Sequence, residues 1–406
     1  MQVHWAKRAA SAMLGACWIF CAAAGDGQKS ANSTSLPNHE SYVGNSACAA
    51  CHEAEARSYT KTAHSLTSRM ADARSILGSF EARSNVLMIA DPETALENPG
   101  LYFRMERRDN RFFETAVAGW PGKYVRRGAA IDVVIGSGVR GQSYLSWQGD
   151  QLFELPVSYW SDGHRWINSP GYQNGTMDFS RPVLPRCLEC HATYIHQRSS
   201  NPLGNTYDRE SLIVGISCET CHGPGRDHVD RERKAAANSA SIAPGILNPA
   251  SLSRDRQIDI CALCHNGLRD EQLAPSFSFT PGEELSKFLQ PDSTQLAQTP
   301  NVHGNQVGLL KRSRCFLLSP RMNCSTCHDV HAPERPAAEY SARCLNCHQI
   351  KACGMSKSMG EKIAEDCIDC HMPIESTTAV VSRTAGDLIR PKMRTHWIRV
   401  YPTPAQ

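Results

Sequence analysis

Beyond its N-terminus, the 406-residue chain has no apolar run long enough to cross a membrane as a helix. It also has no basic tract longer than a few residues, and its formal charge of +3 argues against a general nucleic-acid binder. Long apolar periodic segments are scarce in the C-terminal half, although 41% of all residues are hydrophobic. We therefore expect something other than side chains to fill the core of that half.

Cysteine is abundant, with 18 residues, and 14 of them form seven Cys-x-x-Cys pairs that are each followed directly by His. This is the pattern of covalent haem attachment: two thiols reach the two vinyl groups of one porphyrin, and the histidine binds its iron. Structural zinc and disulfides are the alternatives. Zinc needs four ligands per ion and does not require His after every second Cys. The pattern therefore predicts seven haem c groups.

We number the motifs 1 to 7 along the chain. Their predicted attachment cysteines are Cys48 and Cys51, Cys187 and Cys190, Cys218 and Cys221, Cys261 and Cys264, Cys324 and Cys327, Cys344 and Cys347, and Cys367 and Cys370. The predicted iron ligands on the motif side are, in the same order, His52, His191, His222, His265, His328, His348 and His371.

Each iron has a sixth position, and the supply of histidine indicates what fills it. Outside the motifs and the N-terminal segment eight histidines remain, against seven irons. The predicted sixth ligands are His39, His64, His196, His228, His303, His331 and His396, while His164 is the least favoured of the eight. His331 follows His328 by three residues on one helix face, so it could serve only a neighbouring haem. Ligation by two histidines leaves no open iron and suits electron transfer.

The N-terminus predicts export. Lys7 and Arg8 precede an uncharged apolar stretch that ends in Ala22-Ala23-Ala24, so residues 1–24 read as a signal peptide. A lipid anchor at Cys17 is the alternative. Residues 25–41 are small and polar and predict a flexible tether. A periplasmic or otherwise exported location permits disulfides, and the two unassigned cysteines, Cys315 and Cys353, are predicted to form one.

Three further segments follow the tether: an N-terminal haem segment at 42–97, an antiparallel β insert at 98–165, and a C-terminal multihaem domain at 166–406. Turn residues Asp109-Asn110 and Gly149-Asp150 predict hairpins in the insert, and 160–185 reads as ordered loop. Helices are expected over 47–64, after a Ser253 cap, and after Thr280. The expected fold class is mainly α, with extensive loop, packed around haems.

Several blocks resemble the cytochrome c-554-type multihaem family. They are the opening Tyr42 to His52 with Thr62-Ala63-His64, the block Gly215 to His228, Val302-His303-Gly304, Cys324 to His331, and Cys367 to Pro373. The resemblance covers most of 42–400 apart from the β insert. It implies an electron carrier in which His64, His228, His303, His331 and His396 bind iron. The tetrahaem protein that names the family has fewer haems and no comparable β segment.

Three functions remain open. The favoured one is a heptahaem electron carrier whose partners are redox proteins. The second is an oxidoreductase for a small nitrogen or sulfur oxyanion at a haem with an open position, although the C-x-x-C-K motif typical of nitrite reductases is absent. The third is a structural or sensory haem protein whose β insert binds a partner.

Overall fold

The computed structural model describes residues 38–89, 98–238, 245–267, 270–291, 301–384 and 386–401. The predicted signal peptide, Cys17 and all but the end of the tether lie outside these residues. Within them, no helix has both the length and the apolar character needed to span a membrane.

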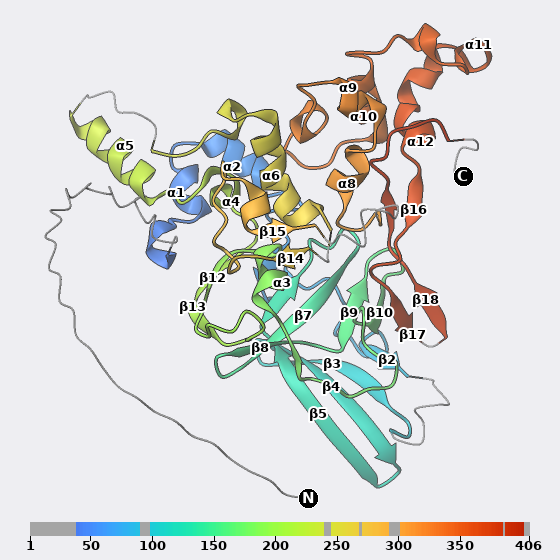
Figure 1. The fold of residues 1–406 in the computed structure, drawn as a ribbon. Coiled ribbons are helices and arrows are strands. Elements are labelled where there is room, and N and C mark those ends of the chain that lie inside the picture. The colour runs from blue at the N-terminus through green and yellow to red at the C-terminus, as the bar shows by residue number, and fades with distance from the viewer. Residues whose placement is uncertain are drawn as a thin grey trace, which may run out of the picture. The chain divides into compact units, whose positions relative to one another are not determined.

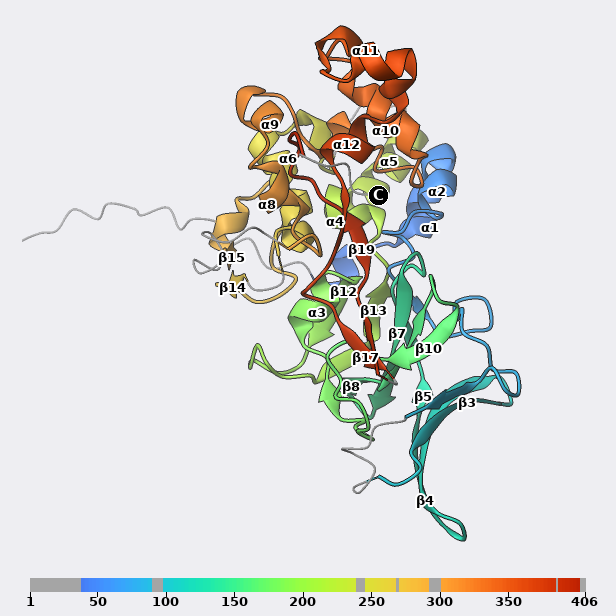
Figure 2. The same ribbon diagram turned by 90° about the vertical axis from the view of Figure 1, so that its right-hand side faces the viewer.

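The expectation of a mainly α fold is wrong, because strand and helix each account for 27% of the chain. The physical reason is that a haem motif needs only one helical turn, so seven motifs do not require long helices. In the two views of Figures 1 and 2, the helices that carry most motifs gather at one end of the unit and the larger sheets at the other.

The first large sheet is a four-stranded antiparallel meander in the order β2-β3-β4-β5. Its strands are β2 (Val86–Met88), β3 (Tyr102–Arg108), β4 (Arg111–Trp120) and β5 (Lys123–Ile131). The hairpin predicted at Asp109-Asn110 is present, and Asp109 takes the left-handed conformation with φ 54° that such a tight turn needs.

The second large sheet has seven strands, with the path β1-β6-β7-β8-β11, and β9 pairs with both β7 and β10. The strands are β1 (Ser68–Met70), β6 (Val133–Ile135), β7 (Gly141–Gln148), β8 (Gln151–Glu154), β9 (Val157–Trp160), β10 (Arg165–Asn168) and β11 (Arg181–Pro182). The Gly149-Asp150 hairpin is confirmed. The segment 160–185, expected to be loop, instead contains β10 and β11.

One apolar core joins the two sheets. Phe103 and Met105 of β3 are fully buried in the same cluster as Tyr144 of β7 and Val157 of β9. A polar contact crosses this core: the backbone N–H of Val157 donates to the buried carboxylate of Glu114 over 3.0 Å. The β strands thus form a packed body of their own beside the haem motifs.

The helices are short. They are α1 (Asn45–Ala49), α2 (Glu53–Tyr59), α3 (Pro185–Glu189), α4 (Cys218–His222), α5 (Arg226–Asn238), α6 (Arg254–His265), α8 (Gln306–Leu310), α9 (Arg314–Leu318), α10 (Ala337–Cys344), α11 (Ser356–Met359) and α12 (Cys367–His371). The 3-10 turns are η1 (His39–Ser41), η2 (Pro249–Ser251), η3 (Leu285–Lys287), η4 (Cys324–Thr326), η5 (Ile350–Ala352) and η6 (Gly360–Glu365).

Two of the three helix expectations need correction. The predicted helix over 47–64 is broken into α1 and α2, because the motif ends its own turn at His52. Ser253 does cap α6, accepting the Arg256 N–H. After Thr280 no α-helix forms, although the Thr280 N–H does donate to the Glu283 carboxylate over 2.9 Å. Gly282, at φ 98°, turns the chain out of helical geometry.

Four two-stranded ribbons complete the described strands: β12 (Ala192–Gln197) with β13 (Tyr207–Val214), β14 (Glu271–Gln272) with β15 (Leu289–Gln290), β16 (Ile374–Ser376) with β19 (Lys392–Arg394), and β17 (Ser382–Thr384) with β18 (Asp387–Ile389). The last two ribbons carry the C-terminus back along the molecule. Arg165 of β10 pairs with Asp387 over 3.0 Å, and Ser313 donates to the carbonyl of His396 over 3.0 Å. His396 is thereby held among the motifs.

Candidate haem-binding sites

Each haem motif is shaped by a single turn of helix. In motif 1 the His52 N–H donates to the Cys48 carbonyl over 2.8 Å, and in motif 5 the His328 N–H donates to the Cys324 carbonyl over 2.9 Å. Residues four apart on such a turn lie on one face. The first cysteine and the histidine of each motif therefore point to the same side, as attachment to one porphyrin requires.

Three motif histidines face a second imidazole at nearly the same spacing. The ring centres of His265 and His64 are 6.0 Å apart, those of His222 and His331 are 6.1 Å apart, and those of His328 and His396 are 6.0 Å apart. The angles between the ring planes differ. They are 20° and 21° for the motif 3 and motif 5 pairs, but 82° for the motif 4 pair.

This spacing fits a shared metal. An imidazole nitrogen lies about 2 Å from a metal it binds, so two rings on opposite sides of one iron have centres about 6 Å apart. Direct packing of two rings does not require that value in three separate places. The three pairs therefore match the space that one iron occupies between two histidines.

Motif 2 has a similar neighbour. Burial lowers the pKa of His191, and the charge of His303 lowers it further, so the two imidazoles lie within electrostatic reach of each other. Burial also lowers the pKa of His303. His303 comes from the loop before α8, more than a hundred residues further along the chain.

Burial keeps two of the paired imidazoles, those of His265 and His396, neutral. It lowers the pKa of His265 to about 4, with a further contribution from His64, and it lowers the pKa of His396 to about 4, with a further contribution from His328. A metal ligand must offer a lone pair, which a protonated imidazole lacks. The protein environment thus holds these rings in the form that binds iron at neutral pH.

Backbone and hydroxyl oxygens orient three of the motif histidines. Nδ1 of His222 lies 2.8 Å from the Leu247 carbonyl, and Nδ1 of His371 lies 2.9 Å from the Arg399 carbonyl. Nδ1 of His191 lies 3.1 Å from the Thr67 hydroxyl. A partner on Nδ1 fixes the ring and leaves Nε2 for a metal, as is usual for ligating histidines.

Thiols of different motifs also touch. Hydrogen bonds join Cys48 of motif 1 to Cys218 of motif 3, and Cys190 of motif 2 to Cys264 of motif 4. Two further pairs, which link motif 4 to motif 5 and motif 6 to motif 7, are Cys261 with Cys324 and Cys344 with Cys367. Because these sulfurs would attach at porphyrin edges, the chain brings the edges of neighbouring haem sites together.

Parts of the chain are similar to known proteins. Residues 164–223, which hold motifs 2 and 3, match the family described as cytochrome c554 and c-prime. Over 209 residues, 50% of this chain and 49% of the relative, the chain is 24% identical to the multiheme cytochrome MtrA of Shewanella baltica (strain OS185). The chain is a multihaem c-type cytochrome.

The cytochrome spans about half the length of the curated relative it matches. Its fold also resembles that of the outer cell wall cytochrome OcwA, with a TM-score of 0.54 over 88% of this chain and 80% of that chain. The identity to OcwA is 15%, so this likeness concerns the fold alone.

His228 is on α5, which packs against η1 in the segment before motif 1. The guanidinium of Arg226, at the start of α5, donates to the carbonyls of Glu40 and Tyr42 just before α1. Nδ1 of His228 is buried without a hydrogen-bond partner among the described residues, and its nearest carboxylate, on Glu232, is 4.0 Å away. Nδ1 of His303 is likewise buried and unpartnered there. A buried nitrogen without a protein hydrogen-bond partner is what we expect beside a bound group that the chain itself does not provide.

Three other histidines lie away from the motif histidines. His39, in η1, has its ring 6.3 Å from that of Tyr194. His196 is exposed on β12, where its backbone N–H donates to the Ser211 hydroxyl. His164 is exposed in the turn between β9 and β10 at φ 47°. The structure does not bring His39 or His196, both predicted as ligands, against a motif imidazole.

Among the described residues, the histidines of motifs 1, 6 and 7 have no ring contact with a second imidazole. For motif 1, the start of α5, which carries His228, is hydrogen-bonded to the segment before α1. Motifs 6 and 7 have no comparable neighbour in the described residues, and His348 is exposed. The sixth position of these two sites therefore has no candidate histidine in the described part of the chain.

Two buried carboxylates join the motifs, and sequence reasoning missed them. Glu219, inside motif 3, accepts the N–H groups of Val43 and Gly44, each over 2.9 Å, and that of Gly225 over 2.8 Å. It thereby ties the start of motif 1 to the loop after motif 3. Glu189, inside motif 2, accepts from Arg186 over 2.7 Å, and Arg186 also donates to the Leu263 carbonyl of motif 4.

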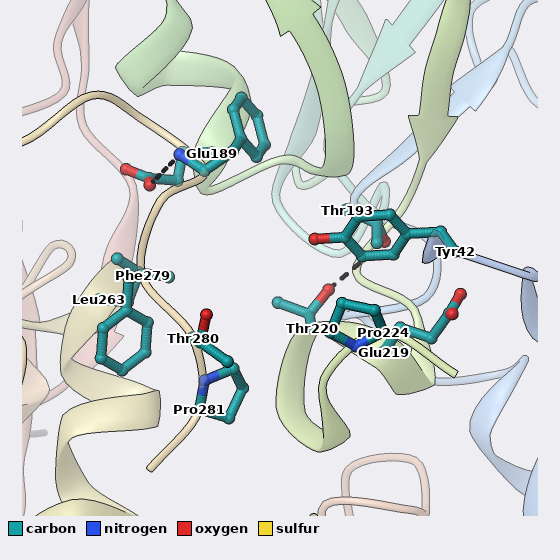
Figure 3. Close-up of a pocket in the computed structure, with 11 residues that line it drawn as sticks. Tyr42, Glu189, Thr193, Glu219, Thr220, Pro224, Leu263, Phe279, Thr280 and Pro281 are labelled. Atoms are coloured by element: carbon teal, nitrogen blue, oxygen red, sulfur yellow. Dashed lines mark hydrogen bonds between the residues drawn. The ribbon is translucent and has the colours of Figure 1, made fainter. Parts of the chain in front are cut away.

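Both carboxylates line one small pocket, shown in Figure 3 with Tyr42, Thr193 and Thr220. The sequence does show an acidic residue between the two cysteines of both motif 2 and motif 3. These residues stand in Leu188-Glu189-Cys190 and Cys218-Glu219-Thr220-Cys221. A charged residue at that position can be read as solvent-exposed just as readily, so the sequence does not reveal the burial.

The predicted disulfide is not present: Cys315 and Cys353 are both free thiols in the structure. They lie beside different partners. Cys315 acts electrostatically on Cys327 of motif 5 and Cys344 of motif 6, whereas Cys353 acts on Cys367 and Cys370 of motif 7. The pairing was inferred by elimination, and elimination carries no information on position.

Proposed function

We propose that this cytochrome is an exported electron carrier that attaches seven haems and exchanges electrons with redox proteins. The observation that carries the proposal is the repeated 6 Å separation of two imidazoles, which suits low-spin iron with no open position. The porphyrins, when bound, supply one-electron redox chemistry, and the protein supplies ligands, orientation and burial.

In this proposal each of five motifs takes one distal histidine. His64 serves motif 4, His331 serves motif 3 and His396 serves motif 5, on the ring separations above. His303 serves motif 2, on its electrostatic contact with His191. His228 serves motif 1, because α5 is anchored to the segment before α1 and its Nδ1 is buried without a partner.

The thiol contacts support a continuous row of sites. Motif 1 touches motif 3, and the charge of Cys221 in motif 3 acts on Cys261 in motif 4. Motif 4 touches motif 5, motif 5 acts on motif 6 through Cys327 and Cys344, and motif 6 touches motif 7. Motif 2 joins the row at motif 4. The order 1–3–4–5–6–7, with 2 beside 4, keeps each site next to another.

Export follows from the chemistry as well as from residues 1–24. Covalent haem attachment and exported cysteine-rich chains belong to compartments outside the cytoplasm. The signal peptide of 1–24 and the lipid anchor at Cys17 both lead there, and they predict different mature N-termini.

Reduction of a small oxyanion is the second candidate function. The observation in its favour is that His348 and His371 have no imidazole opposite them among the described residues. This function requires that the iron at motif 6 or 7 has an open sixth position, to which nitrite, hydroxylamine or cyanide can bind.

The mass of the intact mature protein, together with its haem absorbance per chain, tests the proposal. We expect seven haems per polypeptide and full reduction by a protein electron donor. A count below seven, or haems that remain oxidised while others are reduced, would contradict it. A change of spectrum on adding nitrite would favour the second candidate.

A further inference from the structure

The distal histidines assigned above leave none for the haem sites at motifs 6 and 7. This inference rests on the proposed function, and it concerns motifs 6 and 7. Five distal histidines serve motifs 1 to 5, and three remain: His39, His164 and His196. These three are exposed on η1, on the β9–β10 turn and on β12, and the main packing contacts of the described residues include none between these elements and α10, α11 or α12. Another side chain must fill any sixth position there.

A short connector between the two motifs carries two methionines. Residues 349–366 form η5, α11 and η6, and α11 packs against both of the 3-10 turns that flank it. η6 in turn packs on α10, which ends in motif 6, and leads into α12, which is motif 7. Figures 1 and 2 show α11 at the outer end of the helical region. The connector thus meets motif 6 through η6 and runs directly into motif 7, and α11 packs on η6.

The methionines are uncovered by protein. Met355 is 54% exposed and Met359 is 42% exposed, and Ile363 is the buried residue of the connector. The Met359 N–H donates to the Met355 carbonyl over 3.0 Å, so the two side chains leave the same face of one helical turn. Both thioether sulfurs are therefore accessible to a group that lies on that face.

Other donors of the connector are less suitable. Lys351, Lys357 and Lys362 are exposed, and water solvates their strongly hydrated side-chain nitrogens. The Cys353 thiol lies beside Cys367 and Cys370, the sulfurs that would attach at the porphyrin edge. A residue at the edge is not placed over the iron. A thioether needs no deprotonation and is an established haem ligand.

We propose that Met355 or Met359 supplies the sixth ligand, through its sulfur, to at least one of the haems at motifs 6 and 7. Methionine ligation raises the reduction potential relative to two histidines. The C-terminal end of the row is therefore its high-potential end, where electrons collect before they leave the protein. The exposed position of the connector makes this end accessible to an acceptor.

Ferric haem with a methionine ligand has a weak sulfur-to-iron charge-transfer band that two-histidine haem lacks, and this band tests the proposal. The oxidised wild-type holoprotein should show it. The double variant Met355→Leu/Met359→Leu should lose it completely, and each single variant should show which sulfur is bound. Met88→Leu is the matched control, because Met88 is 59% exposed on β2, in the first large sheet. The control should keep the band.

A redox titration gives a second readout. The highest-potential component should move to lower potential in the double variant and stay in place in Met88→Leu. No band in wild type, a band that survives the double substitution, or high-spin iron at motifs 6 and 7 would overturn the proposal. Intact mass separates this failure from failure of the proposed function, because a chain with seven haems and no methionine band contradicts only the ligand assignment.

Discussion

The rings of His222 and His331 lie 6.1 Å apart and within 20° of parallel, although 109 positions separate them in the chain. His222 belongs to motif 3, and His331 follows motif 5. The chain therefore builds one site from two motifs, which makes neighbouring sites interdependent.

His331→Ala should change motif 3 and leave the other sites intact. We expect one of the seven low-spin ferric signals, of the type given by near-parallel imidazoles, to be replaced by a high-spin signal. EPR of the oxidised protein measures this. His164→Ala is the control, because His164 is exposed in a turn and should change nothing. An unchanged spectrum in His331→Ala would mean that another residue binds this iron.

His64→Ala should remove a different signal. The planes of His64 and His265 cross at 82°, and perpendicular imidazoles give low-spin iron a much more anisotropic EPR signal than parallel ones. We expect the variant to lose a highly anisotropic component and to retain the signals of motifs 3 and 5. Loss of a near-parallel component instead would show that the rings rotate when iron binds.

Glu219→Ala should destabilise the protein through its backbone contacts. The substitution leaves the N–H groups of Val43, Gly44 and Gly225 without their acceptor, at a cost of about 3 kcal/mol or more. Thermal unfolding of the holoprotein measures the loss. Glu219→Gln keeps one acceptor oxygen and should be affected less. Equal stability of wild type and Glu219→Ala would show that water replaces the carboxylate.

Glu154 should make stability depend on pH. Burial raises the pKa of Glu154 to about 7, although Arg181 at 3.2 Å opposes the shift. The folded state thus holds this proton more tightly than the unfolded state, whose pKa is near 4.5. The contribution to stability is complete below pH 4.5 and is lost as pH rises to about 7.

In the Glu154→Gln variant, the unfolding free energy should fall less between pH 4.5 and 7 than in wild type, by about 1–3 kcal/mol. Unfolding midpoints measured across this range provide the comparison. Glu375→Gln is the control, because Glu375 is exposed on β16 and should leave the profile unchanged. A wild-type profile without a fall over this range would contradict the raised pKa of the partly buried Glu154.

The sequence indicated the chemistry better than it indicated the fold. Seven motifs can be read directly, because attachment fixes their spacing. The strands were underestimated because β5, in which residues 123–128 at the start of the strand are all exposed, has no buried alternation to reveal it. Asp109 and Gly149, by contrast, marked their hairpins correctly through turn chemistry.

Pairings across the chain could not be derived from the residues alone. Whether His303 faces His191, or His396 faces His328, depends on how segments far apart in the chain pack together and on ribbons such as β16–β19. The failed Cys315–Cys353 pairing has the same cause. Short motifs specify their own turn, whereas the contacts between motifs arise from the tertiary packing.

EPR of the fully oxidised wild-type protein, with every spin counted, tests the central claim most directly. The account predicts only low-spin iron, with two near-parallel components from motifs 3 and 5 and a highly anisotropic component from motif 4. High-spin ferric iron in any of these three sites, or a total below seven spins per chain, would contradict it.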